Sequence, residues 1–267
     1  GQAHRRHVIL EQLRSKKGFI CDMDGVIYHG NRLLPGVKEF VDWLYRENKN
    51  FLFLTNSSGL SPKEYQQKLA RMGLDVDQSH FYTSALATAS FIKSQSPGGT
   101  AYVIGDHGLM NALYDAGITI NTVDPEFVIV GETENFGYEH IVRAINFVNR
   151  GAKLVATNSD LVDPAEEGVI PSCGSLVAPI QAATGKMPYF VGKPNPLMMR
   201  TGLRLLGVHS EDTVIIGDRM DTDMIAGIAS GMDTALVLSG VTCREDIEQF
   251  PFRPRLILSG VGDIPTL

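Results

Sequence analysis

The chain has 267 residues, of which 43% are hydrophobic and 20% are charged, and 24 Lys and Arg stand against 30 Asp and Glu, a formal net charge of -6. These values exclude a disordered chain and a minimal scaffold held together by disulfides or metals, because a chain of this length buries a large core, or two smaller ones. The mild acidity argues against a nucleic acid polymer or an anionic membrane as the main partner. We therefore expect the partner to be a small molecule.

The cysteines Cys21, Cys173 and Cys243 are widely scattered and include no C-x-x-C pair. This set is typical neither of a disulfide framework nor of a thiolate metal site, so we expect a reducing, cytoplasmic location. The longest apolar runs fall well short of the roughly 18 to 20 residues that span a bilayer, and the sequence therefore predicts no membrane-spanning helix.

Apolar runs with strand character alternate with helical patterns along almost the whole chain, which predicts an α/β fold with a mainly parallel sheet. In chain order, the predicted strands are 18–21, 50–54, 101–104, 127–130, 153–156, 213–216 and 234–238. An i, i+3, i+4, i+7 stripe from Val37 to Leu44 predicts a helix after the first strand. Ser61 and Glu64 form a capping box around Pro62, which predicts the start of another. No Pro-rich linker divides the chain, so a second domain would have to be an insertion within the first.

Asp22 and Asp24 stand two positions apart, directly after the first predicted strand. Because residues i and i+2 of an extended chain project to the same side, both carboxylates would share the crevice beyond the carboxyl end of the strand, where open α/β sheets bind ligands. Like charges this close need a cation. An EF-hand loop is excluded, because it needs Gly at its sixth position and Glu at its twelfth, whereas counting from Asp22 puts Gly25 fourth and Leu33 twelfth.

A second acidic segment, with Asp218, Asp221 and Asp223, follows the sixth predicted strand. Mg²⁺ is bound by a few carboxylate oxygens and keeps positions for water and substrate phosphate, so acids from two strand ends predict a magnesium site. Asp106 and Glu132 also follow a strand and a glycine, but neither has an acidic neighbour. We interpret both as ordinary turn or helix-capping residues.

Hydrogen-bond donors lie between the two acidic segments. Thr55 and Asn56 follow the second predicted strand, and Lys193 comes from an apolar segment held by prolines. Such donors, with one fixed cation, make a phosphate or oxyanion site. Taken singly, Thr55 is explained equally well as a helix cap, and Lys193 as a solvent-exposed side chain.

These four segments, in this order, resemble the motifs of the haloacid dehalogenase (HAD) superfamily of phosphohydrolases: D-x-D, a Thr or Ser after the second strand, a Lys, and G-D-x-x-x-x-D. Further blocks resemble the NagD-like branch of that superfamily, at positions 22–26, 54–56, 130–133, 156–158, 191–194 and 238–241. The resemblance implies a Rossmann-like core with a mainly parallel sheet and a smaller inserted α/β cap. It implies a discontinuous core, residues 1–84 and 189–267, and a cap at residues 85–188.

The resemblance also implies the chemistry. Asp22 would be the nucleophile that forms an aspartyl phosphate, and Asp24 the acid and base. Mg²⁺ would be bound by Asp218, by the carboxylate of Asp22 and by the backbone carbonyl of Asp24, with Asp223 as a supporting acid.

Thr55, Asn56 and Lys193 would hold the phosphoryl oxygens. The substrate would be a small phosphate monoester, a nucleoside monophosphate or a sugar phosphate, read by cap segments 157–174 or 131–138. A phospho-ligand sensor without catalytic activity, on the same fold, is the alternative, and a homo-oligomer stays open. Cysteine-based phosphate chemistry is a poor competitor, because no cysteine here begins a C-x₅-R motif.

Overall fold

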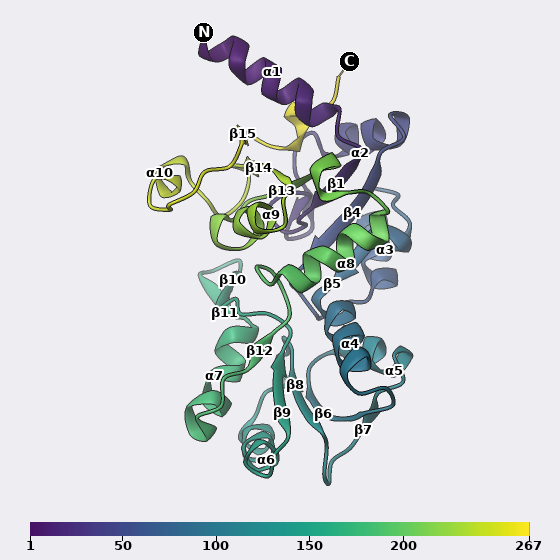
Figure 1. Cartoon of the computed structure of the whole chain (residues 1–267), viewed down its shortest axis with the longest axis vertical. Helices are drawn as coiled ribbons and strands as arrows, with labels where there is room; N and C mark the ends of the chain where they lie inside the picture. Colours follow the sequence, from purple (N-terminus) through teal and green to yellow (C-terminus); the bar gives the residue numbers. More distant parts are fainter. Residues whose placement is uncertain (267) are drawn as a thin grey trace. The chain divides into compact units, whose positions relative to one another are not determined.

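The computed structural model describes residues 1–266, which divide into two compact units, both α/β as the sequence predicts. Residues Gly1–Thr55, Gln66–Tyr82 and the described chain from Met199 onward form the first unit. Asn56–Tyr65 and Thr83–Met198 form the second. Figure 1 shows the elements of both units in the order of the chain.

The first unit is built on a six-stranded sheet with the order β15-β14-β13-β1-β4-β5. Strand β1 pairs in parallel with both β13 and β4, and the parallel pairing continues through β14 to β15. The strands of this sheet are β1 (Gly18–Cys21), β4 (Asn50–Thr55), β5 (Phe81–Thr83), β13 (Thr213–Gly217), β14 (Asp233–Val237) and β15 (Leu256–Leu258). A two-stranded antiparallel ribbon, β2 (Tyr28–His29) and β3 (Arg32–Leu33), follows β1.

Helices and single turns complete this unit, and α3 and α8 each begin in the second unit. They are α1 (Gln2–Arg14), α2 (Val37–Arg46), α3 (Pro62–Arg71), η1 (Gln78–His80), α8 (Pro196–Leu206), η2 (Ser210–Asp212), η3 (Met220–Met224), α9 (Ile225–Ala229), α10 (Arg244–Ile247) and η4 (Val261–Asp263).

One part of the core of the first unit lies between β1 and α2, and another lies at η3, β14 and α10. Strands β1 and β13 are buried along their whole length, as expected for a parallel sheet covered on both faces. The predicted stripe of α2 is buried, and Phe19 of β1 meets Phe40 and Trp43 of that helix edge-on, with ring centroids 6.4 and 5.5 Å apart. This packing fixes β1, and with it the residues that follow the strand.

The second unit contains a five-stranded parallel sheet with the order β12-β9-β8-β6-β7. Its strands are β6 (Thr100–Ile104), β7 (Thr119–Ile120), β8 (Phe127–Val130), β9 (Lys153–Ala156) and β12 (Tyr189–Phe190), and β10 (Val162–Pro164) and β11 (Val169–Pro171) form a separate antiparallel hairpin. Its helices are α4 (Ser84–Gln95), α5 (His107–Asp115), α6 (Tyr138–Asn149) and α7 (Cys173–Thr184). Helices α6 and α7 pack on the sheet through an apolar cluster that includes Val130, Phe147 and Val177.

The second unit is larger than the segment 85–188 that the sequence singled out. It includes β12, because that strand pairs with β9, and it includes the loop after Asn56, because Ser58 is hydrogen-bonded to Glu132. The functional division into a core at 1–84 and 189–267 and a cap at 85–188 stays a prediction.

All seven predicted strands are present, with ends that agree to within one residue. The strands that the sequence missed, such as β7 and β12, are two or three residues long, too short to show a periodicity. Within residues 1–266, no helix combines the length and the apolar character that a bilayer crossing would need.

The predicted capping box at the start of α3 is confirmed. The Glu64 amide donates to Ser61 Oγ at 3.2 Å, and the Ser61 amide donates to Glu64 Oε1 at 3.1 Å. Two amide groups that have no partner within the helix are thereby satisfied.

Replacing this cap should cost measurable stability. We expect Ser61→Ala to lower the free energy of unfolding by about 1 kcal/mol, measured by urea denaturation. Ser94→Ala, inside α4, is the matched control and should be neutral or stabilising, because Ala favours a helix interior. Equal losses in both variants would contradict a specific role for the cap.

Candidate active site

The pairing of β1 with β13 brings two acidic segments together, although they are far apart in the sequence. In the parallel register Cys21 faces Ile216, and the Asp22 amide donates to the Ile216 carbonyl at 2.9 Å. Both strands then end at the same edge of the sheet. Asp22 and Asp218 are the residues that continue from these ends.

Asp22, Asp218 and Asp223 form a compact group of carboxylates. One oxygen of each lies within 4.8 Å of the others. Asp218 is 1% exposed, Asp223 is fully buried and Asp22 is half-buried. Negative charges that lie this close together, with so little exposure to solvent, repel one another strongly, so a bound cation would stabilise the group. The donors are all carboxylate oxygens, which suit a hard divalent cation such as Mg²⁺ better than zinc or copper.

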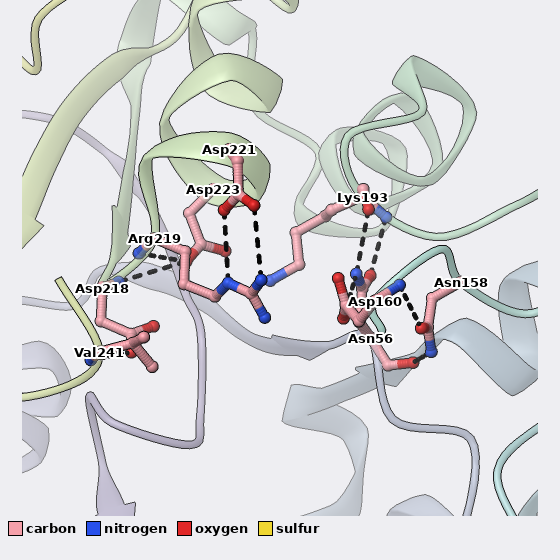
Figure 2. Close-up of polar contacts among 9 residues, drawn as sticks. All are labelled: Asn56, Asn158, Asp160, Lys193, Asp218, Arg219, Asp221, Asp223 and Val241. Atoms are coloured by element: carbon pink, nitrogen blue, oxygen red, sulfur yellow. Dashed lines mark hydrogen bonds and ion pairs between the residues drawn. The ribbon is translucent and has the colours of Figure 1, made fainter. Parts of the chain in front are cut away.

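The loops that contain Gly25 and Gly240 approach Asp218 closely, and Figure 2 shows Val241, which follows Gly240, beside Asp218. The Val241 amide donates to Asp218 Oδ2 at 2.9 Å. A Cβ atom on Gly25 or Gly240 would overlap the Asp218 carboxylate, so only glycine fits at either position. Ser239 Oγ donates to the Gly25 carbonyl at 2.8 Å and ties the two loops together. The orientation of Asp218 is therefore set by its surroundings.

Asp223 lies in η3, a single π-type turn, the kind of irregular helix that is frequent at functional sites. Its Oδ2 accepts hydrogen bonds from the amides of Asp218 and Arg219, both at 3.2 Å (Figure 2). Asp221 belongs to the same turn but is exposed and pairs with Arg219 at 3.4 Å. Asp223 thus supports the backbone of Asp218, whereas Asp221 forms a surface ion pair.

Asp24 follows Asp22 in the same loop and is exposed. Its backbone forms a bridge with Tyr28, and the Gly25 amide donates to the Tyr28 carbonyl at 2.9 Å. Lys68, which the sequence did not single out, lies over the Tyr28 ring at 4.2 Å. Burial lowers the pKa of the Lys68 ammonium group, and the negative charge of Asp24 opposes that shift.

Asn56 and Lys193 form a second polar cluster, which belongs to the second unit, while Thr55 is the buried last residue of β4. The Lys193 amide donates to Asn56 Oδ1 at 2.7 Å, and Asn56 Nδ2 donates to the Lys193 carbonyl at 3.0 Å (Figure 2). Lys193 is only 2% exposed, so the alternative of a solvent-exposed lysine is wrong. A lysine this buried needs a structural or functional reason.

The interpretation of Glu132 as an ordinary turn residue is also wrong. Its carboxylate accepts hydrogen bonds from the Ser58 amide and hydroxyl and from Asn158 Nδ2. In the sequence it was marked by its position after a strand and a glycine, a signal that it shares with Asp106, and by its place in the block 130–133 that resembles the NagD-like branch. Asp106 does occupy the N-cap position of α5, although its side chain makes no capping hydrogen bond.

The cysteines take no part in either cluster. Burial is the main reason why the pKa of Cys173 rises to about 12, and it also raises the pKa of Cys21. Cys243 is exposed, and all three are free thiols. A buried thiol with a raised pKa is a poor nucleophile at neutral pH, which argues against cysteine chemistry.

Comparisons with known proteins agree with this geometry. A family model described as haloacid dehalogenase-like hydrolase matches residues 19–119, and a related HAD-hydrolase-like model matches residues 190–264. The dihydroxyacetone phosphatase of Corynebacterium glutamicum (strain R) is 44% identical over 92% of this chain and 90% of its own length. The ribonucleotide monophosphatase NagD of Escherichia coli (strain K12) is 42% identical over 94% of this chain and 99% of its own length.

Solved structures show the same relation. NagD from E. coli K-12 matches with a TM-score of 0.89, covering 95% of this chain and 100% of NagD. A 4-nitrophenylphosphatase from Thermotoga maritima, 34% identical, matches with a TM-score of 0.91 over 95% of this chain and 97% of its own. The fold, the carboxylate group and these relatives define a phosphomonoesterase. The chain belongs to the NagD-like branch of the haloacid dehalogenase superfamily, as its sequence motifs indicated.

The packing around Asp218 leads to a test. In Gly240→Ala the new methyl group would displace the Asp218 carboxylate, and we expect divalent-cation affinity to fall by about tenfold or more. Gly260→Ala is the matched control, because the nearest atom to its Cβ lies 4.0 Å away. Titration of both variants with Mn²⁺, followed by electron paramagnetic resonance, gives the comparison. Equal affinities would show that the two loops do not fix Asp218.

Proposed function

We propose that this phosphatase requires Mg²⁺, works through an aspartyl phosphate on Asp22, and hydrolyses small phosphorylated metabolites. The observation that carries the proposal is the group of three carboxylates, Asp22, Asp218 and Asp223, at the ends of β1 and β13. Simple phosphate binding would call for cationic or neutral donors at these positions rather than three acids. A metal and a nucleophile account for the acids together.

The residues present fit a magnesium ion. The carboxylates of Asp22 and Asp218 and the backbone carbonyl of Asp24 would hold it, and Asp223 would keep the Asp218 backbone in place through its two amide contacts. When bound, Mg²⁺ neutralises part of the charge on the carboxylates and on the phosphoryl oxygens. Asp22 can then stay ionised at neutral pH while an anionic substrate approaches.

The proposed reaction has two steps. In the first, an Asp22 oxygen forms a bond to phosphorus, the ester bond to the leaving oxygen breaks, and Asp24 gives that oxygen a proton. In the second, a water oxygen forms a bond to phosphorus while Asp24 takes a proton from that water, the bond between phosphorus and the Asp22 oxygen breaks, and inorganic phosphate leaves with the Asp22 carboxylate regenerated. The Met23 amide, which donates to Asp22 Oδ1 at 2.9 Å, orients the nucleophile in both steps.

Thr55, Asn56 and Lys193 are proposed to hold the phosphoryl oxygens. A hydroxyl, a backbone amide and an ammonium group are suitable donors for the charge that spreads over these oxygens in the transition state. The order of the family motifs supports these roles. The burial of all three residues supports them further, because a buried side chain is fixed before the substrate binds.

Relatives guide the choice of substrate class. Their names include a dihydroxyacetone phosphatase, a ribonucleotide monophosphatase and an acid sugar phosphatase. We propose that this chain likewise takes a sugar phosphate or a nucleoside monophosphate. Thr157 and Asn158 are fully buried, so within segment 157–174 the exposed hairpin β10–β11 is the better candidate to contact the organic part of the substrate.

Phosphate release tests the activity and the metal together. The purified chain should hydrolyse 4-nitrophenyl phosphate and members of a panel of sugar phosphates and nucleoside monophosphates in the presence of Mg²⁺. Addition of EDTA should abolish the release, and excess Mg²⁺ should restore it. Undiminished release after complete removal of divalent cations would overturn the proposed metal dependence. Binding of phosphate esters with no release under any condition would support the sensor alternative.

Asp22→Asn tests the nucleophile. The amide keeps the shape of the side chain but cannot accept phosphorus, so turnover should fall by about three orders of magnitude or more. Binding of orthovanadate should largely survive, measured by calorimetry with Mg²⁺ present.

Asp221→Asn is the control, because it removes an acid from η3 without changing Asp22, Asp218 or Asp223. It should keep nearly normal turnover. Substantial activity in Asp22→Asn would reject the assignment of the nucleophile.

A further inference from the structure

The carboxyl-end crevice of the second sheet is occupied by the chain itself. Strand β6 is flanked by β7 on one side and by β8 on the other, so the chain leaves the sheet in opposite directions at β6 and β8. Open α/β sheets bind ligands at such a point. Here the Gly108 amide donates to the Gly59 carbonyl at 3.1 Å, and the Ser58 amide donates to Glu132 at 3.0 Å. The segment 56–60 therefore takes the place that a ligand would take.

Three glycines from separate parts of this unit make room for that segment. A Cβ atom on Gly108 would lie 2.6 Å from the Ser58 carbonyl oxygen, and one on Gly131 would lie 2.6 Å from Ser58 Oγ. A Cβ atom on Gly192 would lie 2.7 Å from Asn56 Oδ1. Real Cβ atoms do not approach other atoms this closely, so glycine at these three positions is what leaves room for the segment.

Glu132 is the centre of the hydrogen bonds that hold the segment. Its Oε2 accepts from the amide and the hydroxyl of Ser58, and its Oε1 accepts from Asn158 Nδ2 and, at 3.5 Å, from Ser172 Oγ. Its own amide donates back to Ser58 Oγ at 3.2 Å. Burial raises the pKa of the Glu132 carboxyl, and the hydrogen bonds from Ser58 and Asn158 oppose that shift.

A continuous series of hydrogen bonds connects Glu132 to the backbone of Lys193. Asn158 Nδ2, which contacts Glu132, also donates to the Asn56 carbonyl at 2.6 Å. The Asn56 side chain then holds the Lys193 backbone by a donor and an acceptor, at 3.0 and 2.7 Å (Figure 2). Asn158 is fully buried and Asn56 and Lys193 nearly so. A change at Glu132 can therefore reach Lys193 through two asparagines.

We propose that Glu132 is a positioning residue for the phosphatase reaction, which fixes Asn56 and Lys193 through Ser58 and Asn158. The inference rests on the proposed roles of Asn56 and Lys193 in holding the phosphoryl group. In this account the strand ends of the second sheet organise phosphate-binding groups rather than a ligand of their own. A carboxylate suits this role because both of its oxygens are acceptors, whereas the amide of a Gln side chain has one acceptor oxygen and an NH₂ group that only donates.

Glu132→Gln is the first test. The amide is isosteric, but its NH₂ group would face the donors of Ser58 or of Asn158, so the network should loosen without a change in volume. We expect the KM for 4-nitrophenyl phosphate and the Ki for inorganic phosphate to rise by about tenfold or more, because misplacement by about 1 Å is costly in a preorganised site. The Mg²⁺ concentration for half-maximal activity should not change, because the carboxylate group belongs to the first unit.

Glu139→Gln is the matched control. Glu139 is an exposed glutamate in the first turn of α6 in the same unit, and its replacement should change none of these constants. Asn158→Ala is the second variant, which cuts the path to Asn56 but leaves the contacts between Glu132 and Ser58. It should raise the Ki for phosphate as Glu132→Gln does, and the double variant should show less than the product of the two effects.

The outcomes separate the inference from the proposed function. Absence of Mg²⁺-dependent hydrolysis in the unmodified chain would overturn the proposed function, and the inference with it. An active chain whose folded Glu132→Gln and Asn158→Ala variants keep the normal KM and Ki would overturn the inference alone. If Glu132→Gln does not fold, Asn158→Ala decides the matter by itself. A fall in melting temperature without a change in Ki would make Glu132 a merely structural residue, and would also overturn the inference.

Discussion

The mutual repulsion of Asp22, Asp218 and Asp223 is the constraint on which the site depends. Their oxygens lie within 4.8 Å of one another, and two of the three residues are almost completely buried. A bound cation would stabilise such an arrangement, and the surrounding fold must hold it in place. The fold does so through the parallel pairing of β1 with β13, through the amide of Val241 on Asp218, and through Asp223 beneath the same backbone. The metal binding, the ionised nucleophile and the tolerance of an anionic substrate that we propose would all follow from that charge balance.

The second unit contains Asn56 and Lys193, which we propose as donors for the phosphoryl group, and it holds both by hydrogen bonds. Glu132, Asn158 and Asn56 form a chain of hydrogen bonds that ends on the backbone of Lys193. Every member is buried or partly buried, so each hydrogen bond is worth more than it would be in water, and a broken one costs more. In both units, therefore, the polar residues lie just after parallel strands and are held in place by the loops that follow.

Much of the fold, and the positions of the acids that form the carboxylate group, could be predicted from the sequence, because the signals are local or lie in recognisable motifs. The seven main strands are apolar runs, the cap of α3 is a four-residue pattern, and Asp22 and Asp218 follow strong strands. The hydrogen bonds of Glu132 could not be predicted, because its partners Ser58 and Asn158 are 74 and 26 positions away. The burial of Lys193 was missed for the same reason: the side chain of its partner Asn56, which holds the Lys193 backbone, is 137 positions away in the sequence. Short strands such as β12 were missed because their pairing, rather than their composition, makes them strands.

Direct measurement of metal binding tests, without relying on turnover, whether Asp22, Asp218 and Asp223 mark a divalent-cation site. Mn²⁺ can replace Mg²⁺ at carboxylate sites, and its binding to the unmodified chain and to Asp218→Asn can be followed by electron paramagnetic resonance. We expect saturable binding to the unmodified chain, and an affinity lower by at least about tenfold in Asp218→Asn, since that variant loses a charged oxygen ligand. Equal affinity in the two proteins, or no binding to the unmodified chain, would contradict the proposed cation site at these carboxylates.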